Sequence, residues 1–551
     1  MGSPTLRPLL FGAVLLSACV AGDATPVAEL ETRAEATDYV ETSRYADVMA
    51  FSEAVAAADP RIHLTTMGYS MEGRPIPLLV VGDVADPSWE TVRTSGKLRI
   101  YAQGSIHAGE VPGKEALQML LREIALGRYD SWLESAVLLI APMYNVDGSE
   151  RVSLTNRRRQ NGPVGGMGQR PNAQGLDLNR DHMKLDSPEA RSLVGMMNDY
   201  DPHLSLDLHT TNGTRHAYHL TYAEPLNPAT APEIQRILRD ELLPEVTRTI
   251  KEKHGWDYYF YGGAYGGTPR GGGGVGFAPR GREAGWYTFD SRPRFNTNYI
   301  GLRNRLAILS EAYAYATFED RVLATYRFVE EIVTWAAERA GDIVDLTETL
   351  DETGVVGEEL AVRAEFQGSE EPVDILMGDV RPIRHPYTGQ TMFDRLDVST
   401  PTPMRTFTTF APAETSTVPE AYLVPADLEV VVDRLRAHGI HFNPLGGEFD
   451  FDVGATQVFR IDSTTVSPRP FQGHNERTLF GSWESNEAWE TQSIEETGAQ
   501  WLFVEVGRPL GRLAFYLLEP RSDDGLVNWG LMDEALEGAD RYPILRIPAR
   551  D

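Results

Sequence analysis

The chain has 551 residues, of which 42% are hydrophobic and 24% are charged, an ordinary composition for a folded protein with a hydrophobic core. Its 80 acidic side chains outnumber its 51 lysines and arginines, so the formal net charge at pH 7 is −29. A charge of this sign repels phosphate backbones, which argues against nucleic acid as a partner. The length is too great for one ordinary domain and suggests about three or four, although a large α/β enzyme can form one unit of ~300 residues.

Residues 1–19 predict an export signal with a lipid attachment site. The apolar run at 9–20 is shorter than the ~20 apolar residues that a membrane-spanning helix needs. The motif Leu-Ser-Ala-Cys, which ends at Cys19, resembles a bacterial lipobox, and no other cysteine occurs in the chain. We expect a lipid on Cys19 to anchor the exported protein in the envelope, at the outer membrane or in the periplasm if the source is diderm. The alternative is a plain signal peptide cut near Ala18 or Ala21, which yields a secreted protein.

The next segment, 20–38, is small, acidic and polar and predicts a tether, and a globular pattern begins at Tyr39. Short apolar runs and helical spacing then alternate as far as residue 345. The predicted strands are 78–81, 98–101, 136–142, 203–208 and 305–311; the predicted helices are 114–126, one opening at 187–189, 234–251 and 321–339. This alternation predicts an α/β domain with a largely buried sheet flanked by helices over residues 39–345.

The remaining segment, 354–551, is richer in threonine, valine and proline and predicts a second, β-rich domain. Short runs at 361–366, 457–461 and 513–518 indicate strands, and 426–438 indicates a helix that ends at a glycine. This accessory domain could bind a ligand or the cell wall, or it could brace the first domain; the pattern does not choose between these roles.

Three polar side chains follow predicted strands of the α/β domain: His107, Glu110 and His209. Ligand clusters at the carboxyl ends of strands meet at the same edge of an open α/β sheet. Two histidines and one carboxylate hold Zn²⁺ and leave a coordination position for water. Zinc-bound water loses its proton near neutral pH and becomes a nucleophile, so this ligand set predicts a hydrolase.

The residues around these three resemble the zinc metallocarboxypeptidases of the carboxypeptidase A superfamily. The resemblance covers about residues 39–340 and is carried by elements in the family's order. They are the His-x-x-Glu pair, Asp177-Leu178-Asn179-Arg180, the helix start Ser187-Pro188-Glu189, a strand ending Asp207-Leu208-His209, and a late strand ending in Glu311. The resemblance implies a mixed sheet flanked by helices and one Zn²⁺ per chain, held by His107, Glu110 and His209.

The resemblance also implies a role for several other residues. Glu311 matches the general base that accepts a proton from the zinc-bound water. Asn179 and Arg180 match the pair that holds the substrate's free carboxylate, for which the planar fork of arginine is well suited. Asp177 matches a carboxylate that orients a zinc ligand, here His107.

Two further assignments stay open between neighbours. Arg159 matches the arginine that stabilises the oxyanion, with Arg158 as the alternative within a run of three arginines. Tyr287 is the candidate for the family's mobile tyrosine, with Tyr299 as its rival.

The specificity pocket of the family is built from the segment that here contains Arg292 and Arg294. These side chains either favour acidic C-terminal residues or lie on a loop surface.

Together these features predict an exported, lipid-anchored zinc carboxypeptidase that acts on peptide or protein C-termini. An alternative on the same fold is a cell-wall peptide carboxypeptidase or an amidase-type deacylase. An alternative of another class is a non-catalytic, peptide-binding lipoprotein, which would have lost a ligand or the base.

Overall fold

The computed structural model describes residues 26–550 except 212, 267–282, 446–455 and 486–499. The predicted signal at 1–19, Cys19 and the first part of the predicted tether lie outside the described residues. No helix within the described ranges is both long and apolar enough to cross a membrane.

The rest of the predicted tether is folded, so that prediction is wrong from residue 26 onward. Residues 26–38 contain the short helices η1 (Val27–Glu29) and α1 (Arg33–Ala36). The Thr32 side chain accepts a hydrogen bond from the Glu35 N–H at 3.1 Å, and the Glu35 carboxylate accepts one from the Thr32 N–H at 2.8 Å. The same carboxylate pairs with Arg122 at 2.8 Å, which fastens this segment to the larger lobe.

The larger lobe is built on an eight-stranded sheet with the order β1-β2-β4-β3-β5-β10-β6-β7. The central strands β4, β3, β5 and β10 are parallel, and antiparallel pairs occur at β1–β2, β2–β4 and β10–β6. The predicted α/β fold with a mixed sheet is therefore confirmed. The strands are β1 (Ile62–Tyr69), β2 (Pro75–Val81), β3 (Leu98–Gly104), β4 (Ala136–Ala141), β5 (Leu204–Thr210), β6 (Leu220–Ala223), β7 (Tyr258–Phe260) and β10 (Leu306–Ala312).

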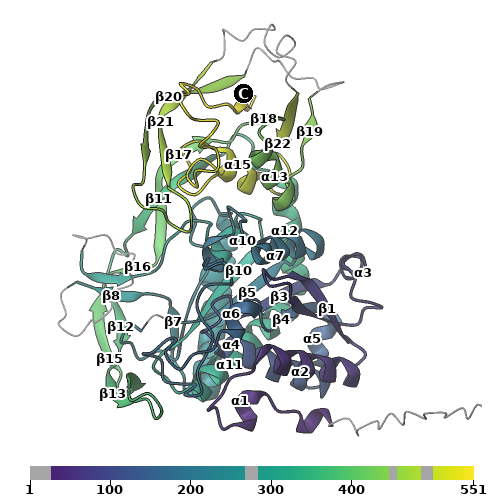
Figure 1. The fold of residues 1–551 in the computed structure, drawn as a ribbon, viewed down its shortest axis with the longest axis vertical. Coiled ribbons are helices and arrows are strands. Elements are labelled where there is room, and N and C mark those ends of the chain that lie inside the picture. Colours follow the sequence, from purple (N-terminus) through teal and green to yellow (C-terminus); the bar gives the residue numbers. More distant parts are fainter. Residues whose placement is uncertain (1–25, 212, 267–282, 446–455, 486–499, 551) are drawn as a thin grey trace, which may run out of the picture.

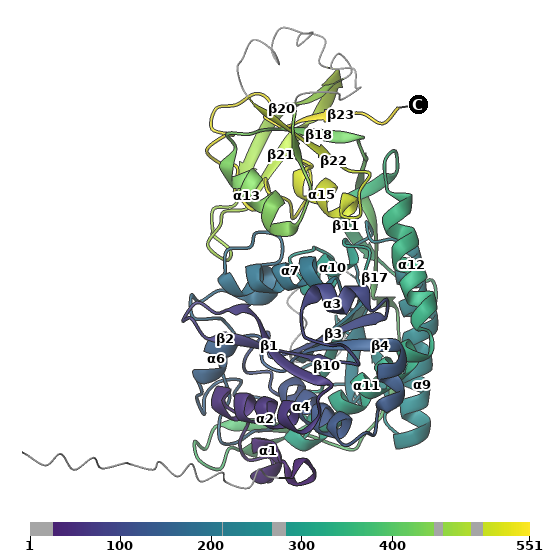
Figure 2. The same ribbon diagram turned by 90° about the vertical axis from the view of Figure 1, so that its right-hand side faces the viewer.

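Helices cover both faces of this sheet (Figure 2). Helices α4, α9 and α11 pack on one face through side chains such as Leu117 and Phe328, and α7 and α10 pack on the other. The predicted helix at 234–251 is a continuous run of α8, a π-helical turn and α9. The helices are α2 (Tyr45–Ala58), α3 (Trp89–Thr94), α4 (Pro112–Ala125), α5 (Asp130–Ser135), α6 (Val146–Glu150), α7 (Pro188–Tyr200), α8 (Pro232–Arg236), α9 (Leu243–His254), α10 (Asn296–Gly301), α11 (Phe318–Glu338) and α12 (Ala340–Thr353).

The smaller lobe contains a six-stranded antiparallel sheet with the order β19-β22-β18-β23-β20-β21 (Figure 1). Its strands are β18 (Ala421–Pro425), β19 (Asn443–Pro444), β20 (Gln457–Val466), β21 (Arg477–Ser485), β22 (Trp501–Glu505) and β23 (Leu545–Ile547). The predicted helix is α13 (Glu429–His438), which ends at Gly439 with φ 77°.

The prediction of a strand at 513–518 is wrong, because this run forms helix α15 (Gly511–Leu518). Every residue of α15 is buried, and the run 513–518 is apolar throughout, so this run lacks the polar positions that would distinguish a helix from a strand.

A ribbon of paired strands joins the two lobes. It comprises β11 (Glu359–Gln367) with β17 (Thr409–Thr417), β12 (Val373–Met377) with β15 (Thr400–Met404), and β13 (Val380–Arg384) with β14 (Thr391–Arg395). Figure 1 shows β12, β15 and β13 beside the larger lobe, away from the six-stranded sheet. Strand β16 (Thr406–Phe407) pairs with β9 (Gly285–Tyr287) of the larger lobe, so the C-terminal region completes a sheet there.

The contact between the lobes contains a buried ion pair. Arg294 is 1% exposed, and its Nε donates to the Asp524 carboxylate at 2.7 Å. Its guanidinium also lies 4.3 Å from the centre of the Trp529 ring. Arg292 pairs with Asp290 and with Glu476 of the smaller lobe. Neither arginine therefore provides the substrate pocket considered from the sequence, and both bind the lobes together.

Candidate metal centre and active site

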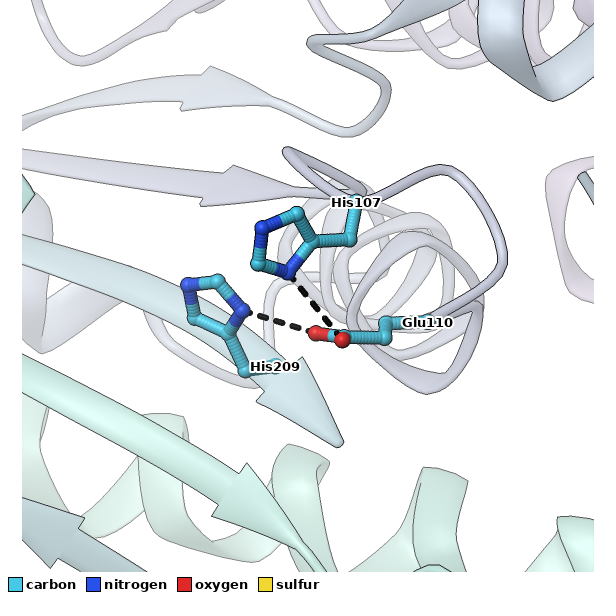
Figure 3. Close-up of side chains that lie close together, drawn as sticks. All are labelled: His107, Glu110 and His209. Atoms are coloured by element: carbon cyan, nitrogen blue, oxygen red, sulfur yellow. Dashed lines mark hydrogen bonds and ion pairs between the residues drawn. The ribbon is translucent and has the colours of Figure 1, made fainter. Parts of the chain in front are cut away.

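The three predicted ligands meet at the carboxyl ends of neighbouring parallel strands (Figure 3). His107 and Glu110 lie in the loop between β3 and α4, and His209 lies near the end of β5. One ligand atom from each residue lies within 4.8 Å of the others. Gly104 makes this loop possible, because a Cβ there would lie 2.7 Å from the Pro142 carbonyl oxygen.

The Glu110 carboxylate lies between the two imidazoles. His107 Nδ1 is 3.1 Å from Glu110 Oε1, and His209 Nδ1 is 2.7 Å from Glu110 Oε2. Burial by itself raises the pKa of Glu110, but the charges of Arg157, His107 and His209 outweigh it and hold this pKa well below its ordinary value. Glu110 is therefore an anionic ligand.

A second carboxylate faces the far nitrogen of each imidazole. His107 Nε2 lies 2.9 Å from Asp177 Oδ1, and His209 Nε2 lies 2.8 Å from Asp207 Oδ2. A carboxylate at Nε2 favours the tautomer with its proton there, which leaves the Nδ1 lone pair for a metal. Both Nδ1 atoms face the centre of the site, so the donor set fits Zn²⁺.

Asp207 has a role that the sequence analysis did not assign. Its other oxygen accepts a hydrogen bond from Gln103 Nε2 at 2.9 Å, and the Tyr101 hydroxyl donates to Gln103 Oε1 at 2.8 Å. The sequence contains a pattern that indicates this role. Residues two apart in a strand share a face, and Asp207 precedes His209 by two. Tyr101 and Gln103 repeat this spacing on β3, next to β5.

Glu311 enters the same site from the next strand. Strand β10 is parallel to β5, and its register places Glu311 beside His209. Burial raises the pKa of Glu311 to about 8, although the charge of His209 opposes this shift. Its Oε2 is buried and has no hydrogen-bond partner within the described part of the chain. This oxygen is available to a water or a substrate.

A cavity of about 130 Å³ connects these residues. Its lining comprises His107, Glu110, Arg157, Arg170, Asn179, Arg180, His209, Thr210, Tyr261, Phe289, Phe295, Thr297, Leu309 and Glu311. We call it the zinc cavity. The metal ligands, the Glu311 carboxylate, three arginines and several apolar side chains all line this one cavity.

Asn179 and Arg180 reach the zinc cavity from a short turn, η2 (Leu178–Arg180). The Asp177 side chain caps this turn by accepting a hydrogen bond from the Asn179 N–H at 3.0 Å. The Arg180 guanidinium lies 3.9 Å from the centre of the Phe295 ring, and burial lowers the pKa of Arg180 to about 10. The cation is thus largely desolvated beside an aromatic face.

Comparison with known proteins agrees with this geometry. Residues 48–278 match the family described as zinc carboxypeptidase, and this range contains the three ligands. The match to this family lies within the larger lobe. It is a metallocarboxypeptidase, and Zn²⁺ is its metal.

Its relatives are distant in sequence. It is similar to carboxypeptidase 2 of Trichophyton tonsurans, with 25% identity over 510 residues that cover 87% of this chain and 81% of the relative. A metallo-carboxypeptidase structure from Burkholderia cenocepacia is 17% identical, with 54% of this chain and 70% of that chain covered and a TM-score of 0.39. A metallo-carboxypeptidase structure from Pseudomonas aeruginosa is 20% identical, with 54% of this chain and 69% of that chain covered and a TM-score of 0.36.

In this carboxypeptidase, two arginines lie beside the metal ligands, Arg157 and Arg170. The Arg157 guanidinium contacts the Glu110 carboxylate, and Arg157 lines the zinc cavity. Arg158 and Arg159, the residues predicted for the oxyanion, do not line that cavity and lie along a neighbouring hollow. The backbone turns at Arg157, with φ 48°, so position in the run does not predict side-chain direction. Arg170 also lines the zinc cavity, and the sequence analysis did not identify it.

Neither predicted tyrosine lines the zinc cavity. Tyr287 is fully buried and stacks on Phe407 at 4.2 Å, and its hydroxyl donates to the Glu283 carbonyl at 2.9 Å. The Tyr299 hydroxyl lies 2.9 Å from His438 Nδ1 in the contact with the smaller lobe. Tyr261 is the tyrosine in the zinc cavity. Burial, with the charges of Glu311 and Glu110, raises its pKa well above the ordinary value, so its hydroxyl keeps its proton.

Replacing Asp207 by asparagine tests whether the carboxylate prepares His209 for the metal. We expect the dissociation constant for zinc to rise about 10- to 100-fold, because the imidazole loses its orienting acceptor. Competition with a chromogenic chelator measures this constant. Asp257→Asn is the matched control, since Asp257 pairs with Lys251 away from the zinc cavity. An unchanged constant in Asp207→Asn would show that Asp207 only supports the fold.

Proposed function

We propose that this carboxypeptidase removes single residues from the free C-termini of peptides, with Glu311 as its general base. The observation that carries the proposal is the register of Glu311 beside His209, in a cavity that also holds the three ligands. When bound there, zinc supplies a lower pKa for water and polarisation of the scissile carbonyl. The unpartnered Oε2 of Glu311 accepts the proton of the attacking water and passes it to the leaving amine.

Arg157 takes the role for which Arg159 was predicted. A guanidinium in a partly water-excluded site stabilises the charge that develops on the carbonyl oxygen. Arg157 fits because it reaches the ligand Glu110 and its side chain is 18% exposed. Arg170 also lines the zinc cavity, and its Nε donates a hydrogen bond to the Asp177 carboxylate at 2.9 Å. It therefore holds the carboxylate that orients His107.

Asn179 and Arg180 hold the carboxylate at the end of the substrate. The guanidinium can donate two parallel hydrogen bonds to a carboxylate. The adjoining wall of the zinc cavity is apolar and contains Tyr261, Phe289 and Leu309. A free carboxylate at Arg180 therefore places the C-terminal side chain against hydrophobic groups.

Retention of the ligands and the base disfavours the non-catalytic alternative. A peptide-binding lipoprotein has no need of a glutamate and a zinc ligand set in one cavity. The arginine anchor is compatible with both protein tails and cell-wall peptides, since both present a carboxylate.

Glu311→Gln tests the assignment of the base. The amide keeps the shape but cannot accept a proton, so we expect zinc binding to persist while kcat falls by at least ~10²-fold. Zinc content by elemental analysis and hydrolysis of an N-acylated dipeptide are measured on the same sample. The control is Glu252→Gln, on the exposed face of α9. Full turnover by Glu311→Gln would remove Glu311 from the mechanism.

The apolar wall predicts the residue that is released. Peptides ending in Phe or Leu should show kcat/KM roughly tenfold or more above those ending in Glu or Lys, because burying a large apolar side chain contributes about 1.5–3 kcal/mol. Mass spectrometry of a peptide set that differs only at its last residue measures this preference. Equally rapid release of Glu or Lys would contradict the assigned pocket.

We also propose that the enzyme is exported and anchored through a lipid on Cys19. Support comes from the lipobox-like motif and from the lone cysteine it contains. In a diderm host, the full chain should enter the membrane fraction and incorporate a labelled fatty acid, and Cys19→Ser should abolish both. Equal labelling and fractionation of the two proteins would refute the anchor.

A further inference from the structure

A second hollow adjoins the zinc cavity and has no role in the proposed chemistry. Its volume is about 600 Å³, and Arg158, Arg159, Gln160 and Gln390 contribute to its lining. We call it the arginine hollow. It shares Arg157 with the zinc cavity, and its Thr211 directly follows Thr210 of that cavity. The two spaces therefore meet at the residue that contacts the ligand Glu110.

Two side chains in the lining of this hollow have buried amide atoms without partners. Gln160 is 5% exposed, and neither its Oε1 nor its Nε2 has a hydrogen-bond partner within the described ranges. The Oε1 of Gln390 is also buried and unpartnered there. Leaving such groups unsatisfied is costly, so they indicate a polar ligand. A primary amide offers one acceptor and donors, which match the N–H and C=O of a peptide group.

The hollow also carries unpaired positive charge. Arg158 and Arg159 are exposed, and neither guanidinium has an ion pair or hydrogen bond to any other described residue. Nearby Arg381 differs, because it pairs with Asp394 at 2.7 Å. Two adjacent free guanidiniums in a chain of net charge −29 favour an anionic ligand.

The C-terminal region forms one wall of the hollow and fixes its shape. Gln390 directly precedes β14 and Thr391 is its first residue, so both belong to the β13–β14 hairpin. The Phe393 N–H donates to the Arg159 carbonyl at 3.2 Å, and the Arg395 N–H donates to the Tyr315 carbonyl at 2.8 Å. These backbone bonds attach the hairpin to the arginine run and to the segment that follows β10.

The positions of the zinc cavity and the arginine hollow suit different parts of one peptide substrate. Asn179 and Arg180 line the zinc cavity and not the hollow, so a peptide held there by its carboxylate extends past the metal ligands toward Arg157. We propose that the arginine hollow binds the residues that precede the scissile bond and selects acidic side chains at these positions. Gln160 bonds to the peptide backbone, and Arg158 and Arg159 bind the carboxylates. This inference rests on the proposed C-terminal cleavage and names its substrate class.

The test uses the full-length, zinc-loaded enzyme and three substrates that all end in Phe. They are Ac-Ala-Phe, Ac-Glu-Glu-Ala-Phe and Ac-Gln-Gln-Ala-Phe. We expect kcat/KM about tenfold higher for the Glu peptide than for the Gln peptide at low salt, and a smaller ratio at high salt because ions screen exposed charges. In Arg158→Gln/Arg159→Gln the ratio should fall to near one. Arg248→Gln removes an exposed arginine on α9 and should keep the ratio.

A second variant tests the backbone contact. Gln160→Leu should raise KM for both tetrapeptides by a similar factor and leave the ratio between them in place, because the amide binds the peptide backbone. An unchanged KM for both would overturn that contact.

The outcomes separate the two proposals. If the wild-type enzyme cleaves all three peptides but shows no preference for Glu, or if the double variant retains it, the arginine hollow does not select acidic residues and C-terminal cleavage stands. If the wild-type enzyme cleaves none of them, the proposed function itself fails.

Discussion

A row of five buried side chains, alternately carboxylate and imidazole, determines what this protein can do. The row runs Asp207, His209, Glu110, His107, Asp177, and each neighbouring pair lies within 3.1 Å. Three carboxylates and two imidazoles place an excess of negative charge in a buried space, which is costly unless cations balance it. Arg157 and Arg170 supply part of the balance at the edges, and a divalent metal held by His107, Glu110 and His209 would supply the rest.

The rest of the fold holds this row in place from both sides. The register of the parallel strands places Gln103 of β3 beside Asp207 of β5, and Glu311 of β10 beside His209 of β5. The smaller lobe reaches the other end of the row, where the Asp177 N–H donates to Gln472 Oε1 at 2.8 Å. The β13–β14 hairpin, in the ribbon that joins the lobes, forms a wall of the arginine hollow. The C-terminal region thus contacts the site at Asp177 and at the arginine hollow, and it also packs against the larger lobe. Binding a separate ligand and bracing the first domain are therefore not the only two roles to consider for it.

The sequence predicted the parts of the site that regular strands position. The apolar runs at 98–101, 203–208 and 305–311 become β3, β5 and β10, and alternation along them sets the faces of His209 and Glu311. The resemblance implied the three metal ligands and a base at Glu311, and the structure brings these four residues together in one cavity. The conformation of the loops could not be predicted from the sequence. The backbone turns at Arg157, and for this reason Arg157 rather than Arg159 reaches the metal ligands. Tyr287 and Tyr299 were predicted to lie in the site, but contacts with Phe407 and His438 of the C-terminal region bury them elsewhere. These contacts join residues that are distant in sequence. The run at 513–518 was misread because burial on every side removes the helical spacing.

We expect His107, Glu110 and His209 to hold one catalytic zinc ion per chain. The most direct measurement is zinc content against peptidase rate, on full-length protein taken through chelation and stepwise return of zinc. We expect activity to fall to background in the metal-free protein and to return in proportion to bound zinc, with its maximum at one ion per chain. Full activity in protein shown to contain no metal, or a maximum that requires a second ion, would contradict it.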